Sequence, residues 1–121
     1  MHDFDKLAAG YIDTWNERDL AARDAAIDRL WAADARYTDP LADAQGRDAI
    51  GATVAAVQQQ FPDFEFRLAG PVDGHHDQCR FSWELGPRGG EAPVAGFDVA
   101  MIGTDGTIRN VLGFLDRVPA S

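Results

Sequence analysis

The hydrophobic pattern of the chain changes its period at Phe61-Pro62, and no other feature constrains the fold as strongly. Before this point apolar residues recur at helical spacing, which is typical of amphipathic helices. After it they alternate with polar residues, which is typical of half-buried strands. Helices first and strands last predict an α+β fold, with three N-terminal helices packed on one face of a curled antiparallel sheet.

The three predicted helices cover residues 3–16, about 20–33 and about 47–61. Asp3 is the expected N-cap of the first helix, because its carboxylate can accept a backbone N–H of the first turn. Pro62 ends the third helix. The predicted buried stripes of the three helices consist of Leu7, Tyr11 and Trp15, of Ile27, Leu30 and Trp31, and of Ile50, Val54, Val57 and Phe61.

The predicted sheet contains a short strand at 35–38 and a later meander of four strands, at 64–68, 80–85, 94–103 and 107–116. The short strand stops at Asp39-Pro40, because proline lacks an N–H and disfavours helical backbone in the residue before it. The expected turns of the meander lie at Asp73-Gly74, at 86–90 and at Asp105-Gly106, the last pair being typical of a two-residue hairpin.

The strand that begins at Val94 is apolar on both faces. One face carries Ala95, Phe97, Val99 and Met101, and the other carries Val94, Ala100 and Ile102. The helices can cover only one face of the sheet. We therefore expect a homodimer through the outer face, the alternative being that the C-terminal tail or a loop covers it.

Asp98 lies in the middle of this strand, on the face of Ala100 and Ile102, where a carboxylate is costly unless it has partners. A two-residue turn at Asp105-Gly106 places Asp98 opposite Gly113, which leaves space beside it. A buried carboxyl beside a glycine suits a ligand cavity, and desolvation is expected to raise its pKa. The alternative is an aspartate that tyrosine or tryptophan donors satisfy in a closed core.

Asp39 and Tyr11 are the other candidate site residues. The Asp39 carboxylate can point into the same concavity from the opposite wall, or it can cap backbone N–H groups in an Asx-Pro turn. Tyr11 shares a helix face with Leu7 and Trp15, so it is either a proton donor or a core tyrosine with a hydrogen-bonded hydroxyl.

Length and composition exclude several classes of protein. The 121 residues, 45% of them apolar, fit a single domain over 1–121. A net charge of −9 with one lysine, Lys6, leaves no basic patch for nucleic acid or anionic lipid, and no apolar run is long enough for a membrane helix. The lone Cys79 and the acidic start of the chain predict a reducing, cytoplasmic setting. His75-His76-Asp77 has no third ligand at a supporting spacing, so we expect no metal.

Five segments together resemble the nuclear transport factor 2-like superfamily, in particular small bacterial proteins similar to ketosteroid isomerases and SnoaL-like polyketide cyclases. They occur in the family's order and span nearly the whole chain. This resemblance implies a cone-shaped α+β barrel with an internal pocket, and usually a dimer through the outer sheet surface. The segments are YIDTWNERD at 11–19, ARYTDP at 35–40, GRDAI at 46–50, GFDV at 96–99 and DGTI at 105–108.

The resemblance also implies roles for three residues. In ketosteroid isomerases the residue matching Asp39 is the general base, the one matching Asp98 is a protonated donor to the enolate oxygen, and the one matching Tyr11 is its partner. In the cyclases the residue matching Asp98 is instead the acid/base catalyst. Both chemistries transfer a proton at the carbon next to a carbonyl, and neither needs a metal or an organic cofactor.

The leading hypothesis is therefore a small-molecule enzyme of the isomerase or cyclase type that takes a small, flat, apolar substrate. One alternative is a non-catalytic binding protein for an apolar metabolite, and another is a dimeric scaffold domain whose cavity is filled by Trp15, Trp31 and Trp83. A cavity that touches Asp39 and Asp98 would favour the first two, whereas a sealed core would remove both. The expected lining residues are Trp15, Phe81, Trp83, Val111, Gly113 and Leu115.

Overall fold

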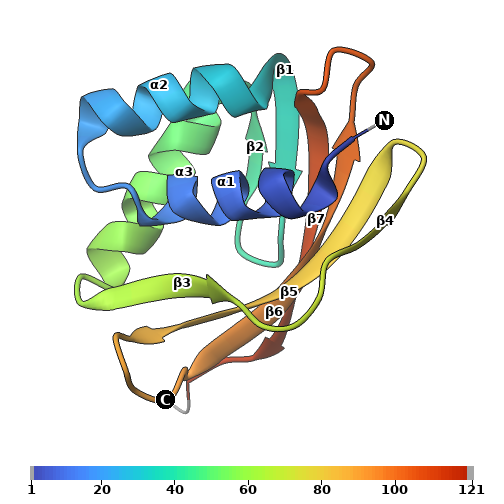
Figure 1. Ribbon diagram of the computed structural model, residues 1–121. Coiled ribbons are helices and arrows are strands. Elements are labelled where there is room, and N and C mark those ends of the chain that lie inside the picture. The colour runs from blue at the N-terminus through green and yellow to red at the C-terminus, as the bar shows by residue number, and fades with distance from the viewer. Residues whose placement is uncertain (1, 120–121) are drawn as a thin grey trace.

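The computed structural model describes residues 2–119, and within them three helices pack in the hollow of a curved, unclosed seven-stranded sheet (Figure 1). The elements are α1 (Phe4–Asn16), α2 (Leu20–Leu30), β1 (Trp31–Thr38), β2 (Asp43–Gln45), α3 (Arg47–Gln60), β3 (Phe64–Leu68), β4 (Asp73–His75), β5 (Gln78–Pro87), β6 (Val94–Ile102) and β7 (Ile108–Arg117). The strand order in the sheet is β2-β1-β7-β6-β5-β3, and β4 pairs with β5. The predicted α+β class is confirmed.

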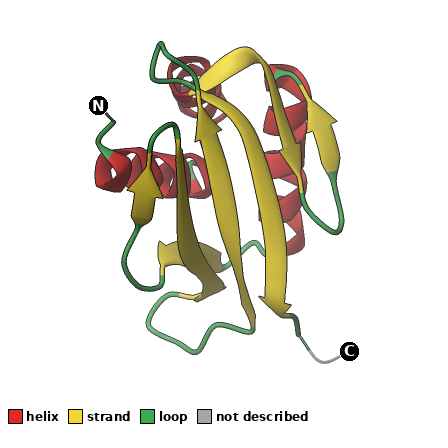
Figure 2. Cartoon of the chain, turned by 90° about the vertical axis from the view of Figure 1, so that its right-hand side faces the viewer, coloured by secondary structure: helices red, strands yellow, loops and turns green. Residues whose placement is uncertain are grey.

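The helices lie together on one side of the sheet, and Figure 2 shows the long strands in front of them. Most neighbouring strands run antiparallel, but β1 pairs with β7 in parallel. The sheet is therefore mixed rather than antiparallel throughout, because the chain passes through α3 and the whole meander before β7 returns beside β1. No helix in residues 2–119 is long and apolar enough to cross a membrane.

Aspartate side chains begin two of the helices. The Asp3 carboxylate accepts the Lys6 backbone N–H at 3.1 Å, which confirms the predicted N-cap of α1. Asp19 caps α2 in the same way, through the Ala22 N–H at 2.9 Å. Each cap satisfies a backbone donor that has no partner within the helix.

The predicted end of the second helix at about Ala33 is wrong. Helix α2 ends at Leu30, and Trp31 already belongs to strand β1, where it pairs with Ile108 of β7. The run of alanines around Trp31 suits a helix by propensity alone. Pairing with β7 overrides that preference, because it buries Trp31 and Ala35 against the core.

The predicted turn at Asp73-Gly74 is also wrong, because both residues lie in strand β4. The chain reverses instead after His75, where His76 has a φ of 52° in the left-handed region. Gly74 serves packing rather than turning, since a Cβ there would lie 2.5 Å from the Phe4 ring. A glycine that admits a neighbouring ring has the same sequence signature as a turn glycine.

The hairpin between β6 and β7 differs from the expected two-residue turn. The Gly103 N–H donates to the Thr107 carbonyl, so Thr104, Asp105 and Gly106 form the loop. Strand β7 then contains one additional residue, Arg109, which has no partner in the register. This bulge restores the predicted register, and Asp98 does lie opposite Gly113.

The outer face of the sheet carries apolar side chains that nothing in the described chain covers. Met101 of β6 is 44% exposed, and Phe114 of β7 is 50% exposed. Phe97 and Phe114 stack there with ring centroids 4.9 Å apart. Val99 and Leu112 complete this group, which we call the outer apolar patch (Phe97, Val99, Met101, Leu112 and Phe114).

Candidate functional site

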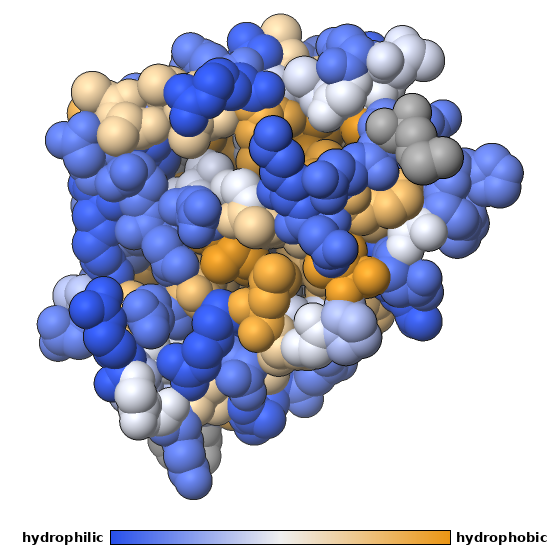
Figure 3. All heavy atoms as spheres, in the orientation of Figure 1, coloured by the Kyte–Doolittle hydropathy of each residue, from blue (hydrophilic) through white to orange (hydrophobic). Residues whose placement is uncertain are grey.

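A cavity of about 420 Å³ lies between the helices and the concave face of the sheet. Figure 3 shows apolar side chains at the centre of the molecule between α1 and β3, surrounded by hydrophilic residues. Leu41 and Val118 are exposed and line the cavity, which places them at its mouth. The lining residues are Tyr11, Ile12, Trp15, Tyr37, Asp39, Leu41, Val57, Gln60, Phe61, Phe66, Trp83, Leu85, Val94, Asp98, Leu115, Val118 and Pro119.

Asp98 is the most deeply buried acid of the cavity wall, with 2% of its surface exposed. The Tyr11 hydroxyl donates to its Oδ2 at 2.6 Å, and the Trp83 indole N–H donates to its Oδ1 at 3.1 Å. Burial, with a smaller contribution from the nearby Asp39 charge, raises the pKa of Asp98 to about 6 against the lowering effect of these two hydrogen bonds. The carboxyl therefore titrates close to neutral pH.

Asp39 follows β1 and is held mainly by its own turn. Its Oδ1 accepts the backbone N–H groups of Leu41 and Ala42, each at 2.8 Å. Its Oδ2 accepts the Tyr37 hydroxyl at 2.5 Å. The local Asx-turn expected for this position is thus present, and the residue lines the cavity as well.

Gly113 of β7 lies against the side chains of both Asp98 and Asp39. A Cβ added to Gly113 would lie 2.9 Å from Asp98 Oδ1 and 3.2 Å from the Asp39 Cβ. Any side chain on this residue would push Asp98 away from Trp83. The glycine thus allows a mid-strand acid and a strand-end acid to share one end of the cavity.

The six predicted lining residues have three different placements in the structure. Trp15, Trp83 and Leu115 line the cavity as expected. Phe81 and Val111 are instead buried in the core behind it, and the Phe81 ring packs edge-on against Tyr11 at 5.2 Å. Phe81 is paired with Asp98 across the sheet, but its side chain fills the space behind Tyr11. Gly113 acts through its missing side chain, as described above.

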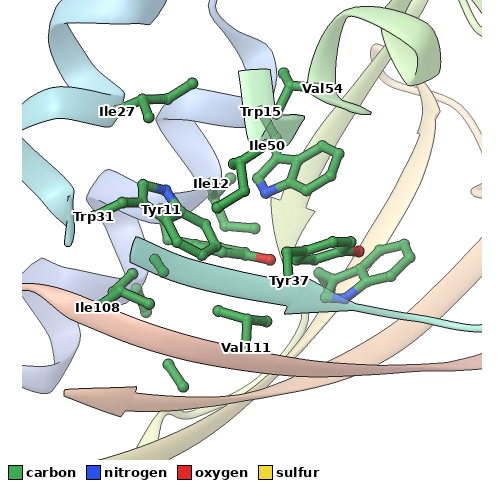
Figure 4. Close-up of a cluster of buried hydrophobic side chains, with 14 of the residues drawn as sticks. Tyr11, Ile12, Trp15, Ile27, Trp31, Tyr37, Ile50, Val54, Ile108 and Val111 are labelled. Carbon is green, nitrogen blue, oxygen red and sulfur yellow. The ribbon is translucent and has the colours of Figure 1, made fainter. Parts of the chain in front are cut away.

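Tyr37 is a cavity residue that was not predicted from the sequence. It lies two positions before Asp39 on the same strand, and strand periodicity could have placed both on one face. Figure 4 shows the Tyr11 and Tyr37 side chains extending in the same direction within the buried cluster. Burial, followed by the charge of Asp98, raises the pKa of both phenols, so both hydroxyls are protonated donors at neutral pH.

The predicted stripe of α3 also contains part of the cavity wall. Ile50 and Val54 are buried in the core, whereas Val57 and Phe61 are only partly buried and line the cavity. The stripe therefore changes its role along the helix, from core packing to ligand contact. A periodic pattern identifies the inward face but cannot distinguish these two roles.

The family model of the SnoaL-like domain matches residues 8–111, and the chain belongs to this family. It is similar to a protein from Agrobacterium tumefaciens provisionally assigned as an isomerase of the SnoaL-like family. That similarity amounts to 41% identity over 93% of this chain and 97% of the other, with a TM-score of 0.90. No protein of curated function matches the chain.

Two more distant structures share the fold. One, from Sinorhizobium meliloti, is provisionally assigned as a polyketide cyclase, with 19% identity, a TM-score of 0.70 and coverage of 89% of this chain and 93% of the other. The other is an NTF2-like protein of unknown function from an Exiguobacterium, with 22% identity, a TM-score of 0.72 and coverage of 91% and 98%. At these identities the likeness concerns the fold alone.

Proposed function

We propose that the protein is a small-molecule enzyme that moves a proton at the carbon next to a carbonyl, as isomerases and cyclases of this type do. The observation that carries the proposal is a buried carboxyl, Asp98, on the wall of an apolar cavity, with a pKa of about 6. A general acid/base is most effective when its pKa lies near the working pH. The provisional isomerase assignment of the similar Agrobacterium protein is consistent with this chemistry.

We assign the proton transfer to Asp98 rather than to Asp39. Both Asp98 oxygens accept hydrogen bonds, and the indole of Trp83 can only donate, so these two contacts, unlike burial, stabilise the ionised carboxylate that acts as a base. Asp39 accepts three hydrogen bonds, two of them from backbone N–H groups that cannot turn away. These bonds hold the Asp39 carboxylate in its own turn, whereas Asp98 is the acid whose pKa burial raises.

The proposed step begins with ionised Asp98. One of its oxygens takes the proton from the carbon next to the carbonyl, and the electron pair of that C–H bond forms a C=C bond while the carbonyl π pair moves to oxygen. A proton on Oδ2 releases the Tyr11 hydroxyl, which then donates to the new enolate oxygen. If the enolate is conjugated with a C=C bond, return of the proton from Asp98 to the far carbon re-forms the carbonyl and completes an isomerisation. If the enolate carbon instead attacks a second carbonyl, a C–C bond forms and the proton from Asp98 goes to the resulting alkoxide, which completes a cyclisation.

Deuterium exchange tests this proposal without knowledge of the natural substrate. We expect the protein to speed the loss of the α-proton signals of tetralone, a flat ketone, in deuterium oxide, as followed by proton NMR. Asp98→Asn removes the base and should abolish the acceleration. Asp13→Asn, an exposed acid on α1, changes the net charge equally and should leave it intact. An unchanged rate with Asp98→Asn would refute the assignment.

The second candidate function is non-catalytic binding of a small apolar metabolite. It is favoured by the lining of the cavity, which consists mainly of aliphatic and aromatic side chains. In that case tetralone would bind and shift the melting temperature, while its α-protons would exchange at the rate found without protein. A cavity that reaches both acids favours either function over the scaffold alternative, which requires a filled core.

We also propose that the protein forms a homodimer through the outer apolar patch. The same patch on a second copy would cover Met101, Leu112 and Phe114, and a two-fold axis makes the contact self-complementary. Val99→Arg places a charge at the centre of the patch and should give monomers or insoluble protein on a sizing column. Thr104→Arg, in the exposed β6–β7 loop, is the matched control. An unchanged dimer with Val99→Arg would place the interface elsewhere.

A further inference from the structure

We propose that the natural ligand of the cavity carries a protonated amine on a flat apolar body. The first observation is the charge of the wall. Asp39 and Asp98 line the cavity, and none of its described lining residues is a lysine, arginine or histidine. The ion pairs within residues 2–119 involve other acids, so neither aspartate has a cationic partner there.

The two carboxyl groups also act on each other. A Cβ added to Gly113 would meet both the Asp98 Oδ1 and the Asp39 Cβ, so the two side chains flank this residue, and the charge of Asp39 is one of the causes that raise the pKa of Asp98. Like charges in a partly dry cavity repel more strongly than in water. A cation bound between them would replace this repulsion with two attractions.

Both carboxylates have unused acceptor positions, which suit a cationic group that also donates hydrogen bonds. An ionised carboxylate offers about four acceptor positions. Asp98 uses one on each oxygen, and Asp39 Oδ2 uses one, for the Tyr37 hydroxyl. An ammonium group has three N–H donors that can fill the remaining positions. The protein's own phenol and indole donors leave these positions open.

A band of aromatic rings connects the two acids along the cavity wall. The centroids of Tyr37 and Trp15 are 5.3 Å apart, those of Trp15 and Phe66 are 5.4 Å apart, and those of Phe66 and Trp83 are 5.3 Å apart. The band begins at Tyr37, which donates to Asp39, and ends at Trp83, which donates to Asp98. Aromatic faces attract cations, most strongly in a desolvated site, and aromatic walls accept a flat apolar body.

This inference rests on the proposed function in that it names the substrate class of the same cavity. The lining residues provide hydroxyl and indole donors for an enolate but no positive charge. An ammonium group on the substrate would supply that charge next to the developing enolate oxygen. A substrate carboxylate or phosphate would instead meet two acids, within a protein whose net charge is −9.

Three probes with one aromatic body and different charges test the inference: naphthylmethylamine, naphthylmethanol and naphthoate, each titrated by calorimetry at pH 7.5. We expect the amine to bind at least about tenfold more tightly than the alcohol, and naphthoate to bind more weakly than either. Asp98→Asn and Asp39→Asn should each reduce the preference for the amine. Asp13→Asn, with the same change in net charge outside the cavity, should preserve it.

Equal binding of the amine and the alcohol, or preferred binding of naphthoate, would overturn the inference. The affinities of the three probes for the wild-type protein decide this even if a variant fails to fold. The binding measurements with the three probes and the exchange measurement with tetralone test different claims, so one can fail while the other succeeds. Amine preference without exchange leaves the ligand class standing and removes the catalysis, whereas exchange without amine preference does the reverse.

Discussion

The two acids of the cavity are held in opposite ways. Asp39 is fixed by neighbours in sequence: the Leu41 and Ala42 backbone N–H groups and the Tyr37 hydroxyl, all within three residues of it. Asp98 is fixed by Tyr11 and Trp83, which lie 87 and 15 residues away along the chain. The first arrangement forms with its turn, whereas the second requires α1 to be docked against the sheet.

The different hydrogen-bond donors of the two aspartates also give them different chemical properties. Backbone donors keep the Asp39 charge satisfied whatever the cavity contains, because the turn fixes them. The donors to Asp98 are side-chain groups in a buried site, where desolvation outweighs them and brings the pKa of Asp98 to about 6. Donors fixed by a local turn thus suit a carboxyl that holds the backbone, whereas donors from distant elements suit a carboxyl whose protonation depends on the folded environment.

The largest expected effect is the unequal loss of proton transfer in the two asparagine variants. Asp98→Asn should reduce the exchange rate of tetralone on the order of a thousandfold, which lies in the range of a lost general base. Asp39→Asn should reduce it by less than about tenfold, because it changes a neighbouring charge and not the base. Initial rates by NMR measure both. Equal losses would show that the two acids act as one unit and would break the comparison.

The second effect is a stability difference that depends on pH. The pKa of Asp98 is raised from 3.8 to about 6, so between these values the folded state binds more protons than the unfolded state, and stability falls as pH rises. The whole shift corresponds to about 3 kcal/mol. Asp98→Asn should remove this loss, so that the variant gains stability relative to wild type as pH rises through the window.

Urea unfolding at several pH values measures this effect, and the difference between the two proteins cancels the other titrating groups. Asp39→Asn is the matched comparison and should reproduce only a small part of the gain, because the Asp39 charge contributes less than burial to the raised pKa of Asp98. Parallel curves for wild type and Asp98→Asn would mean that burial does not shift the pKa of Asp98. That result would remove the physical basis for its assignment as the acid/base.

Sequence patterns predicted those parts of the fold that depend on local rules. The period of the hydrophobic residues predicted the helices and the meander, and Asp3 and Pro62 marked helix ends by their hydrogen-bonding chemistry. Trp31 and the parallel pairing of β1 with β7 were missed, because they depend on a strand that lies far away in the sequence. The opposition of Asp98 and Gly113 was predicted correctly, although the loop had one residue more than expected and the bulge at Arg109 compensated for it.

In the candidate site, too, some residues could be predicted from local patterns and others could not. Asp39, Asp98 and Tyr11 could be named from residue type and position, and the structure brings all three to one cavity. Tyr37 and Phe66 were missed, since an aromatic residue in a strand has the same pattern in a core as in a cavity wall. Phe81 was expected in the wall and lies behind it for the same reason. Whether an inward-facing residue lines a cavity or fills the core depends on how separate helices and strands pack together, which a local sequence pattern does not contain.

A smaller effect is expected from Gly113→Ala, which touches both acids at once. The new Cβ would lie 2.9 Å from Asp98 Oδ1, so the carboxyl must move and its hydrogen bond with Trp83 is strained. We expect a loss of about 2 kcal/mol in unfolding free energy, as is typical of overpacking, together with slower exchange. Gly10→Ala, in α1, meets only Leu30 at 4.0 Å and should stabilise the protein. A neutral Gly113→Ala would mean that the cavity end is looser than the structure indicates.

The smallest effect separates the two phenols. Tyr11→Phe removes the strongest hydrogen bond that lowers the pKa of Asp98, so the midpoint of the pH–rate profile should move upward from about 6. Hydrogen bonds to charged groups contribute about 1.5 kcal/mol or more, enough to resolve in such a profile. Tyr37→Phe removes a donor to Asp39 only and should leave the midpoint in place. If both variants shift it equally, the two acids titrate as a coupled pair, and the distinction between a locally fixed charge and a proton-exchanging one no longer holds.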